Sequence, residues 1–101
     1  MVFWVYVLRC ADGSYYTGHT DNLEQRIDAH QTGAYPGYTS SRLPTKLVWS
    51  QEFATRNEAL SAEMQIKGWS RNKKEAMIRG DWHQVSLLAK KDFERGRRLK
   101  P

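Results

Sequence analysis

The chain has 101 residues and a formal net charge of +5, enough sequence for one small domain and too little for two. Hydrophobic residues make up 40% and aromatic residues 12%, which excludes a disordered chain. The charge is uneven, because residues 1–66 contain 5 Lys and Arg against 7 Asp and Glu, whereas residues 67–101 contain 11 against 4. The last third is therefore basic, and it favours a polyanion such as nucleic acid, or an anionic membrane surface, as its partner.

Cysteine content and hydropathy indicate a cytoplasmic protein. The single Cys10 allows no internal disulfide, which is typical of a reducing compartment. The longest apolar run, residues 2–8, is far shorter than the ~20 residues of a membrane-spanning helix and lacks the features of a signal peptide. The histidines His19, His30 and His83 do not have the spacing of a zinc site.

The first predicted element is a β-hairpin. Residues 2–8 are β-branched and aromatic without clean alternation, which is typical of a strand buried on both faces. Asp12 and Gly13 form a two-residue turn signal, and residues 14–20 return as the second strand. Gly18 inside that strand indicates a bulge or a place where another group approaches the backbone closely.

A helix, a loop and a third strand are predicted next. Asp21 and Glu24 are spaced as a cap and the third helical residue, so the helix should begin at Asp21 and end near Gly33. Residues 34–45 contain Pro and Gly residues that are typical of a loop. Loops as long as this one are usually functional or mobile in a compact domain. Residues 46–53 have the composition of a strand.

The remaining elements are predicted to be helical. Thr55 and Glu58 form a capping box that opens a helix through about residue 69. A short basic helix over residues 71–79 follows, and Asp81 and Gln84 are spaced to cap a last helix.

This order of elements, ββαβαα, predicts a fold of the α/β class (α+β type). We expect a small three-stranded antiparallel sheet flanked by helices. One domain should cover residues 1–94, and residues 95–101 should form a basic, flexible C-terminal tail.

Five side chains suited to phosphodiester chemistry fall on these elements: Tyr6, Tyr16, Arg26, His30 and Glu63. Hydrolysis of a phosphodiester requires neutralisation of the phosphate, a base that takes a proton from water, and support for the leaving oxygen. Mg²⁺ is commonly held by one or two carboxylates, so a single Glu63 suffices in principle.

Each of these residues also has a simpler structural interpretation. The two tyrosines could be ordinary core residues, Arg26 a solvated helix residue, and His30 a surface or hydrogen-bonded histidine. Glu63 and Lys67 are four residues apart, so they could form only a weak surface ion pair. Taken singly, each structural interpretation is favoured over the functional one.

Taken together, these residues resemble the GIY-YIG nuclease family. Residues 5–7 (Val-Tyr-Val) stand where the family has Gly-Ile-Tyr, and residues 16–18 (Tyr-Thr-Gly) stand where it has Tyr-Ile-Gly. The steps of ten residues from Tyr6 to Tyr16, ten to Arg26 and four to His30 agree with the family layout. Residues 38–39, 47–49 and 59–74 resemble small stand-alone bacterial members, so the match runs from about residue 4 to residue 82.

The resemblance implies a role for each reactive side chain. Tyr6 would activate or position the attacking water, alone or with His30, and Arg26 would bind the scissile phosphate. Tyr16 would orient water or phosphate, and Glu63 would hold one divalent ion, Mg²⁺ or Mn²⁺. The implied fold is a three-stranded antiparallel sheet flanked by helices, in agreement with the elements read from the sequence.

Substrate contacts are expected beside these residues and in the basic segment. Gly18 would let the nucleic-acid backbone or the metal shell come close. The other expected contacts are His19, Lys67, Arg71, Lys73 and Lys74. The basic residues could instead form a solvated helical face, and a membrane-surface role is less favoured because no wide apolar face lies opposite them.

We therefore expect a metal-dependent endonuclease acting on DNA, or on RNA. Two alternatives stay open. No counterpart is found for an Asn that supports the site in many relatives, which motivates a nucleic-acid-binding module without turnover. The absence of room for a separate DNA-binding domain motivates a nuclease subunit that needs a partner protein.

Overall fold

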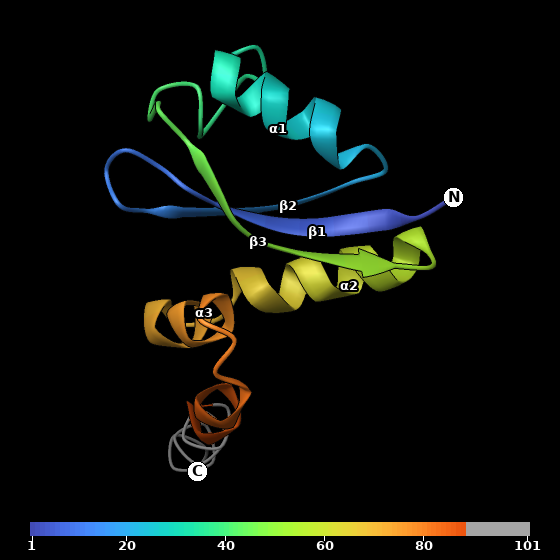
Figure 1. The fold of residues 1–101 in the computed structure, drawn as a ribbon, viewed down its shortest axis with the longest axis vertical. Helices are drawn as coiled ribbons and strands as arrows, with labels where there is room; N and C mark the ends of the chain where they lie inside the picture. The colour runs from blue at the N-terminus through green and yellow to red at the C-terminus, as the bar shows by residue number, and fades with distance from the viewer. Residues whose placement is uncertain (89–101) are drawn as a thin grey trace, which may run out of the picture. The chain divides into compact units, whose positions relative to one another are not determined.

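The first unit of the chain, Met1–Lys67, is built on a three-stranded antiparallel sheet. The structure, a computed structural model, describes residues 1–88. β1 (Phe3–Arg9) lies between β2 (Tyr15–Thr20) and β3 (Lys46–Phe53), as Figure 1 shows. The predicted α/β class, with three antiparallel strands in the order ββαβαα, is confirmed.

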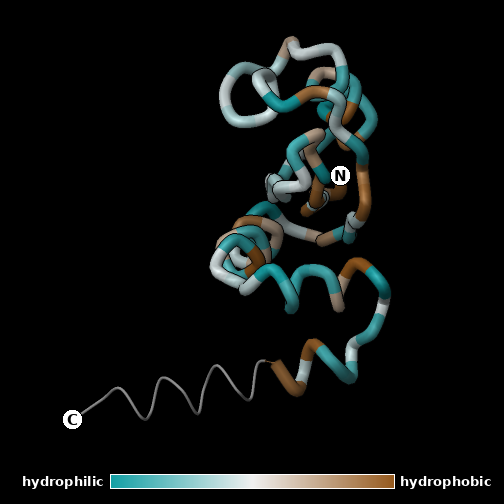
Figure 2. The backbone as a smooth tube through the Cα atoms, turned by 90° about the vertical axis from the view of Figure 1, so that its left-hand side faces the viewer, coloured by the Kyte–Doolittle hydropathy of each residue, from teal (hydrophilic) through white to brown (hydrophobic). Residues whose placement is uncertain are grey.

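The central position of β1 explains its unbroken apolar sequence. Residues 5–8 are completely buried, and the hydropathy colouring of Figure 2 marks this apolar run near the N-terminus. A strand with a neighbour on each edge and a helix over each face must bury both of its sides. The predicted strand buried on both faces is therefore confirmed.

Helix α1 (Leu23–Thr32) begins later than predicted, and Asp21 does not cap it. The side-chain oxygen of Asn22 accepts the backbone N–H of Gln25 at 3.2 Å. The backbone N–H of Asn22 donates in turn to the Thr20 hydroxyl at 3.0 Å, which fixes the turn from β2 into the helix. The predicted start at Asp21 is thus wrong, whereas the predicted end at Gly33 is confirmed by its positive φ of 78°.

Helix α2 (Arg56–Lys67) opens with the predicted capping box and ends before the predicted residue 69. The Thr55 hydroxyl accepts the backbone N–H of Glu58 at 3.2 Å. The helix packs across all three strands and buries Ala59, Glu63 and Ile66. Residues 34–45 form neither helix nor strand, as predicted.

The second unit starts at Gly68 and contains α3 (Arg71–Ile78), which Ser70 caps. Residues 82–88 are helical, and the Asp81 carboxylate accepts the backbone N–H of Gln84 at 3.1 Å, as predicted. The predicted tail over residues 95–101 lies outside the described residues, and a single domain over residues 1–94 stays a prediction. Within residues 1–88, no helix combines the length and apolar character needed to cross a membrane.

Candidate active site

A polar cavity of about 340 Å³ opens at the edge strand β2 in the first unit. Seven of the residues that the sequence singled out line it: Tyr6, Tyr16, Gly18, His19, Arg26, Glu63 and Lys67. Four lining residues were not among the predicted site residues: Thr20, Asp21, Tyr35 and Arg56. Residues from two strands, two helices and the loop after α1 therefore meet at one place.

The strand register explains how the cavity collects residues from both faces of the sheet. Tyr6 is paired with Gly18, and Val5 is paired with His19. Side chains alternate between faces along a strand, and paired residues share a face, so Tyr6 and His19 point to opposite faces. Helices α1 and α2 lie on opposite sides of the sheet, and the cavity spans the edge of β2 between them (Figure 1).

Gly18 is the point at which the edge strand makes room for Tyr6. A Cβ atom at Gly18 would lie 2.6 Å from the Tyr6 hydroxyl oxygen and 3.2 Å from a ring carbon of Tyr16. Both distances are shorter than ordinary van der Waals contacts, so no other residue fits here without displacement. The close approach predicted at Gly18 is made by the Tyr6 side chain.

The Tyr6 hydroxyl begins a buried chain of hydrogen bonds. It lies 2.9 Å from Nε2 of His30, and Nδ1 of His30 lies 2.7 Å from the Thr39 hydroxyl. All three residues are almost completely buried. Thr39 was quoted in the family resemblance but not predicted as a site residue, because nothing in its own sequence context shows that it lies beside His30.

Burial sets the protonation states of this chain. The pKa of Tyr6 is raised far above its ordinary value, first by burial and then by Tyr16, while Arg26 opposes the shift. Burial, followed by the neighbouring Tyr35, raises the pKa of Tyr16 to about 12. The pKa of His30 is lowered by burial and by the Arg26 guanidinium. At neutral pH the phenols are therefore protonated and the imidazole of His30 is neutral.

Arg26 brings positive charge to the cavity from helix α1. Its guanidinium carbon lies 4.6 Å from the centroid of the Tyr35 ring, so the loop after α1 holds this side chain against the cavity wall. Arg56 adds a second guanidinium and lies 3.9 Å from the carboxylate of Asp21. Two arginines in one polar cavity suit an anionic group such as a phosphate.

Glu63 supplies a carboxylate to the cavity from helix α2. Its Oε1 lies 3.0 Å from Nδ1 of His19, and its Oε2 lies 3.6 Å from the Lys67 ammonium. A part-buried carboxylate in a polar cavity is a donor that suits Mg²⁺ or Mn²⁺, with water and substrate oxygens as the other ligands. Nowhere in residues 1–88 do three or more His, Cys, Asp or Glu residues form a metal-binding cluster.

Three of the predicted substrate contacts belong to the second unit. Lys73 is buried, with its ammonium 4.2 Å from the centroid of the Trp69 ring. Arg71 forms an ion pair with Glu75 at 3.4 Å, and burial lowers the pKa of Lys74. A substrate contact by Arg71, Lys73 or Lys74 stays a prediction.

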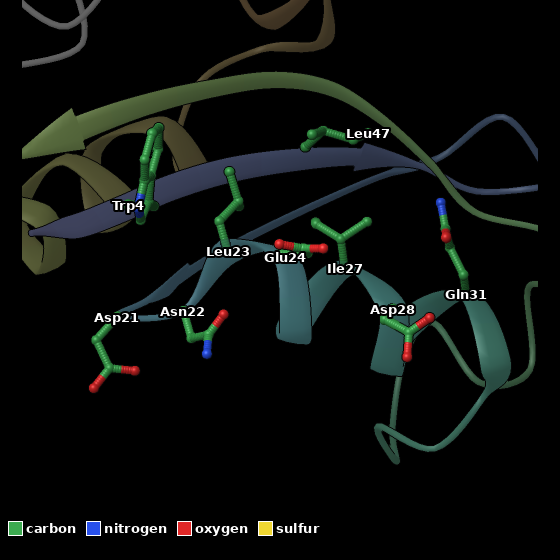
Figure 3. A pocket seen from close by; sticks show the side chains of 9 residues that line it. All are labelled: Trp4, Asp21, Asn22, Leu23, Glu24, Ile27, Asp28, Gln31 and Leu47. Carbon is green, nitrogen blue, oxygen red and sulfur yellow. The ribbon is translucent and has the colours of Figure 1, made fainter.

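A larger cavity of about 600 Å³ lies beside helix α1, and its lining differs in chemistry. Figure 3 shows Leu23 and Ile27 directed from α1 toward the strands that carry Trp4 and Leu47. Its polar rim carries the carboxylates of Asp21, Glu24 and Asp28, and its lining contains no Lys or Arg. Such a surface repels phosphate, so the smaller cavity is the candidate active site.

Comparison with known proteins agrees with the geometry. The family model described as the GIY-YIG catalytic domain matches residues 2–76. A UPF0213 protein of Lacticaseibacillus paracasei is 43% identical over 82% of this chain and 91% of its own length. A UPF0213 protein of Clostridium perfringens is 48% identical over 74% of this chain and 81% of its own length.

A solved structure extends this comparison to the fold. The solution NMR structure of protein EF2693 from E. faecalis is 35% identical, with a TM-score of 0.56 over 83% of this chain and 88% of that one. The fold, and not the motifs alone, is therefore shared with a solved relative.

Proposed function

Because this chain belongs to the GIY-YIG family, a nuclease family, we propose that it is a metal-dependent endonuclease that hydrolyses phosphodiester bonds of DNA or RNA. One observation carries the proposal: a single cavity is lined by a buried tyrosine, an arginine and a carboxylate. DNA is the first substrate to test, and the cytoplasm is the compartment we infer from the buried free thiol of Cys10.

Tyr6 and His30 form the proton-accepting part of the proposed mechanism. A phenol with a raised pKa is protonated at neutral pH, so it can take a proton from water only if it gives up its own. Nε2 of neutral His30, at 2.9 Å, is placed to receive that proton. The Thr39 hydroxyl lies 2.7 Å from Nδ1 and can accept from Nδ1–H, and in that tautomer Nε2 is the accepting nitrogen.

Arg26 and Glu63 complete the proposed site. Arg26 binds the scissile phosphate and offsets the charge that the phosphate gains during attack. Glu63 would hold the divalent ion, which supplies a positive charge that stabilises the leaving oxygen. Tyr16 lines the same cavity and orients the phosphate or the water.

The test is a cleavage assay on labelled single-stranded, duplex and branched DNA and on RNA, with Mg²⁺ or Mn²⁺. We expect Arg26→Ala, Glu63→Gln and Tyr6→Phe each to lower kcat/KM by at least about a hundredfold. The matched controls Arg9→Ala and Glu52→Gln change exposed side chains of the same types outside the cavity and should leave the rate unchanged.

The outcomes separate the proposal from its alternatives. Cleavage that survives both Arg26→Ala and Glu63→Gln contradicts the assigned site. Nucleic-acid binding without cleavage of any substrate, in every metal, indicates a binding module. Cleavage that appears only after a co-purifying protein is added indicates a subunit that needs a partner.

A further inference from the structure

The imidazole of His19 and the carboxylate of Glu63 face each other inside the candidate active site. His19 lies on β2 on the face covered by α2, and its Nδ1 is 3.0 Å from Oε1 of Glu63. The side chain of His19 is 25% exposed and that of Glu63 is 11% exposed, and both residues line the cavity. At this separation the two groups share a hydrogen bond, and both are of the types that bind divalent ions.

We propose that His19 is a second protein ligand of the divalent ion held by Glu63, so that the site favours Mn²⁺ or Co²⁺ over Mg²⁺. This inference rests on the proposed function, because it concerns the ion of the same site. It changes the role expected of His19 from a substrate contact to an ion ligand.

The separation of the two atoms fits a shared ion. Divalent ions of this size bind oxygen and nitrogen at about 2.1 Å, so two ligands at right angles lie about 3 Å apart. Nδ1 of His19 and Oε1 of Glu63 are 3.0 Å apart and hydrogen-bonded to each other, so an ion that binds both must replace this hydrogen bond while the two atoms keep about the same separation. For Nδ1 to bind, its lone pair must face the ion and the ring proton must lie on Nε2, which the partly exposed ring allows.

The donor types set the expected ion preference. Mg²⁺ strongly prefers oxygen ligands and keeps most of its waters, so an imidazole adds little to its binding. Mn²⁺ and Co²⁺ accept imidazole nitrogen, and affinity for such a site rises from Mn²⁺ to Co²⁺. A carboxylate alone discriminates less among these ions than a carboxylate with an imidazole, so the selectivity that His19→Ala loses measures the contribution of His19.

The experiment measures ion binding directly, without substrate. The full chain without an affinity tag is titrated calorimetrically with Mg²⁺, Mn²⁺ and Co²⁺, as wild type, His19→Ala, His19→Gln and Glu63→Gln. The matched control is His83→Ala, because His83 is exposed and lies in the second unit. Spin-echo spectroscopy of the Mn²⁺ form tests for coupling to an imidazole nitrogen.

The expected result is a loss specific to the transition ions. His19→Ala should weaken Co²⁺ and Mn²⁺ at least about tenfold and change Mg²⁺ by less than about twofold. Glu63→Gln should weaken all three ions, and His83→Ala should weaken none. Retained Mg²⁺ affinity also shows that His19→Ala is folded. His19→Gln keeps a hydrogen-bond donor for Glu63 but lacks the ring nitrogen, so it should not restore Co²⁺ affinity.

Two results would overturn the inference. Restoration of Co²⁺ affinity by His19→Gln would show that His19 only positions Glu63. Equal affinity of wild type and His19→Ala for every ion would show that His19 takes no part in binding. Failure of the proposed function would give a different result. Co²⁺ binding through His19 without cleavage of any nucleic acid would support the ion site and contradict the nuclease activity.

Discussion

At the scale of single residues, some positions in the candidate site restrict the size of the side chain, and others fix its charge. Gly18 and His30 are the two clearest cases. Gly18 leaves the space that the Tyr6 hydroxyl occupies, and His30 is completely buried between Tyr6 and Thr39. Both positions can be tested through stability as well as activity.

Replacement of Gly18 by Ala should destabilise the fold by about 1–3 kcal/mol. The added Cβ would lie 2.6 Å from the Tyr6 hydroxyl oxygen, so the Tyr6 ring must move. Denaturant unfolding of Gly18→Ala gives the cost. The same change in a Tyr6→Phe background should cost less, because the nearest clashing atom is absent. An equal cost in both backgrounds would contradict this account.

Burial of neutral His30 should make stability depend on pH. Its pKa is lowered in the folded protein, so the unfolded chain binds more protons on acidification. The contribution is therefore complete above the ordinary pKa of about 6.5 and is lost as pH falls below it. The melting temperature of wild type should fall over that range, and that of His30→Gln should fall less. An imidazole NMR titration of His30 with a midpoint above 6.5 would contradict the assignment.

At the scale of elements, the sequence predicted which segments are strands and helices more surely than where each begins. The apolar run of β1 and the Thr55–Glu58 capping box are local signals, and the structure confirms both. The predicted hairpin is present, but its predicted two-residue Asp12–Gly13 turn is wrong, because the Gly13 N–H donates to the Cys10 carbonyl at 2.9 Å and so places Ala11 and Asp12 at the centre of the turn. The predicted start of α1 was wrong because Asp21 and Asn22 are both residue types that cap helices. The Thr20 hydroxyl accepts the Asn22 N–H and so fixes Asn22 in the capping position. Sequence spacing alone does not record that contact.

Substitution of Asn22 should therefore cost more than substitution of Asp21. Asn22→Ala removes the side-chain oxygen that accepts the Gln25 N–H, and we expect a loss of about 1 kcal/mol in the free energy of unfolding. Asp21→Ala removes only an exposed pair with Arg56 at 3.9 Å and should cost less than about 0.5 kcal/mol. Chemical denaturation of both variants checks this order, and a larger loss at Asp21 would reverse it.

One turn of α2 places Lys67 beside the carboxylate that would hold the ion. Its ammonium is 3.6 Å from Oε2 of Glu63. The positive charge of Lys67 would therefore repel a divalent ion bound to the same carboxylate. Lys67→Met should therefore raise the affinity for Mg²⁺ and for Co²⁺ by about fivefold each, as measured by calorimetry. Lys46→Met, which changes an exposed lysine on β3, is the control. Unchanged or weaker binding in Lys67→Met would show that the ion lies elsewhere.

At the scale of the whole molecule, the excess of basic residues and the candidate site occupy different parts of the chain. The first 66 residues carry more acidic than basic side chains, whereas residues 67–101 carry 11 Lys and Arg against 4 Asp and Glu. The candidate site is assembled from the first unit. Substitutions in the basic segment and in the cavity therefore test the proposed nucleic-acid binding and the proposed cleavage separately. The family resemblance already placed Tyr6 with His30, whereas the contact of His30 with Thr39 could not be predicted from sequence spacing, because it depends on how the loop after α1 folds.

Binding to nucleic acid should weaken steeply with salt if the basic residues contact phosphates. We expect the affinity for labelled DNA to fall at least tenfold between about 50 and 200 mM salt. Arg71→Gln should reduce the slope of log affinity against log salt by about one unit, since it removes one exposed cation. Lys73→Gln should instead lower stability, because Lys73 is buried against Trp69. An affinity for DNA that does not change with salt would show that the basic segment does not contact the phosphates.

The position of the cavity across the edge of β2 has a further consequence. The hydrogen-bonded chain of Tyr6, His30 and Thr39 is on one face of the sheet, and the His19–Glu63 pair is on the other. The backbone of the edge strand separates the two groups, so each has its own packing environment. Substitutions on opposite sides of this one strand should therefore change the proposed acid–base chemistry and the proposed ion choice separately, with ion affinity as the readout for one and the pH profile of cleavage for the other.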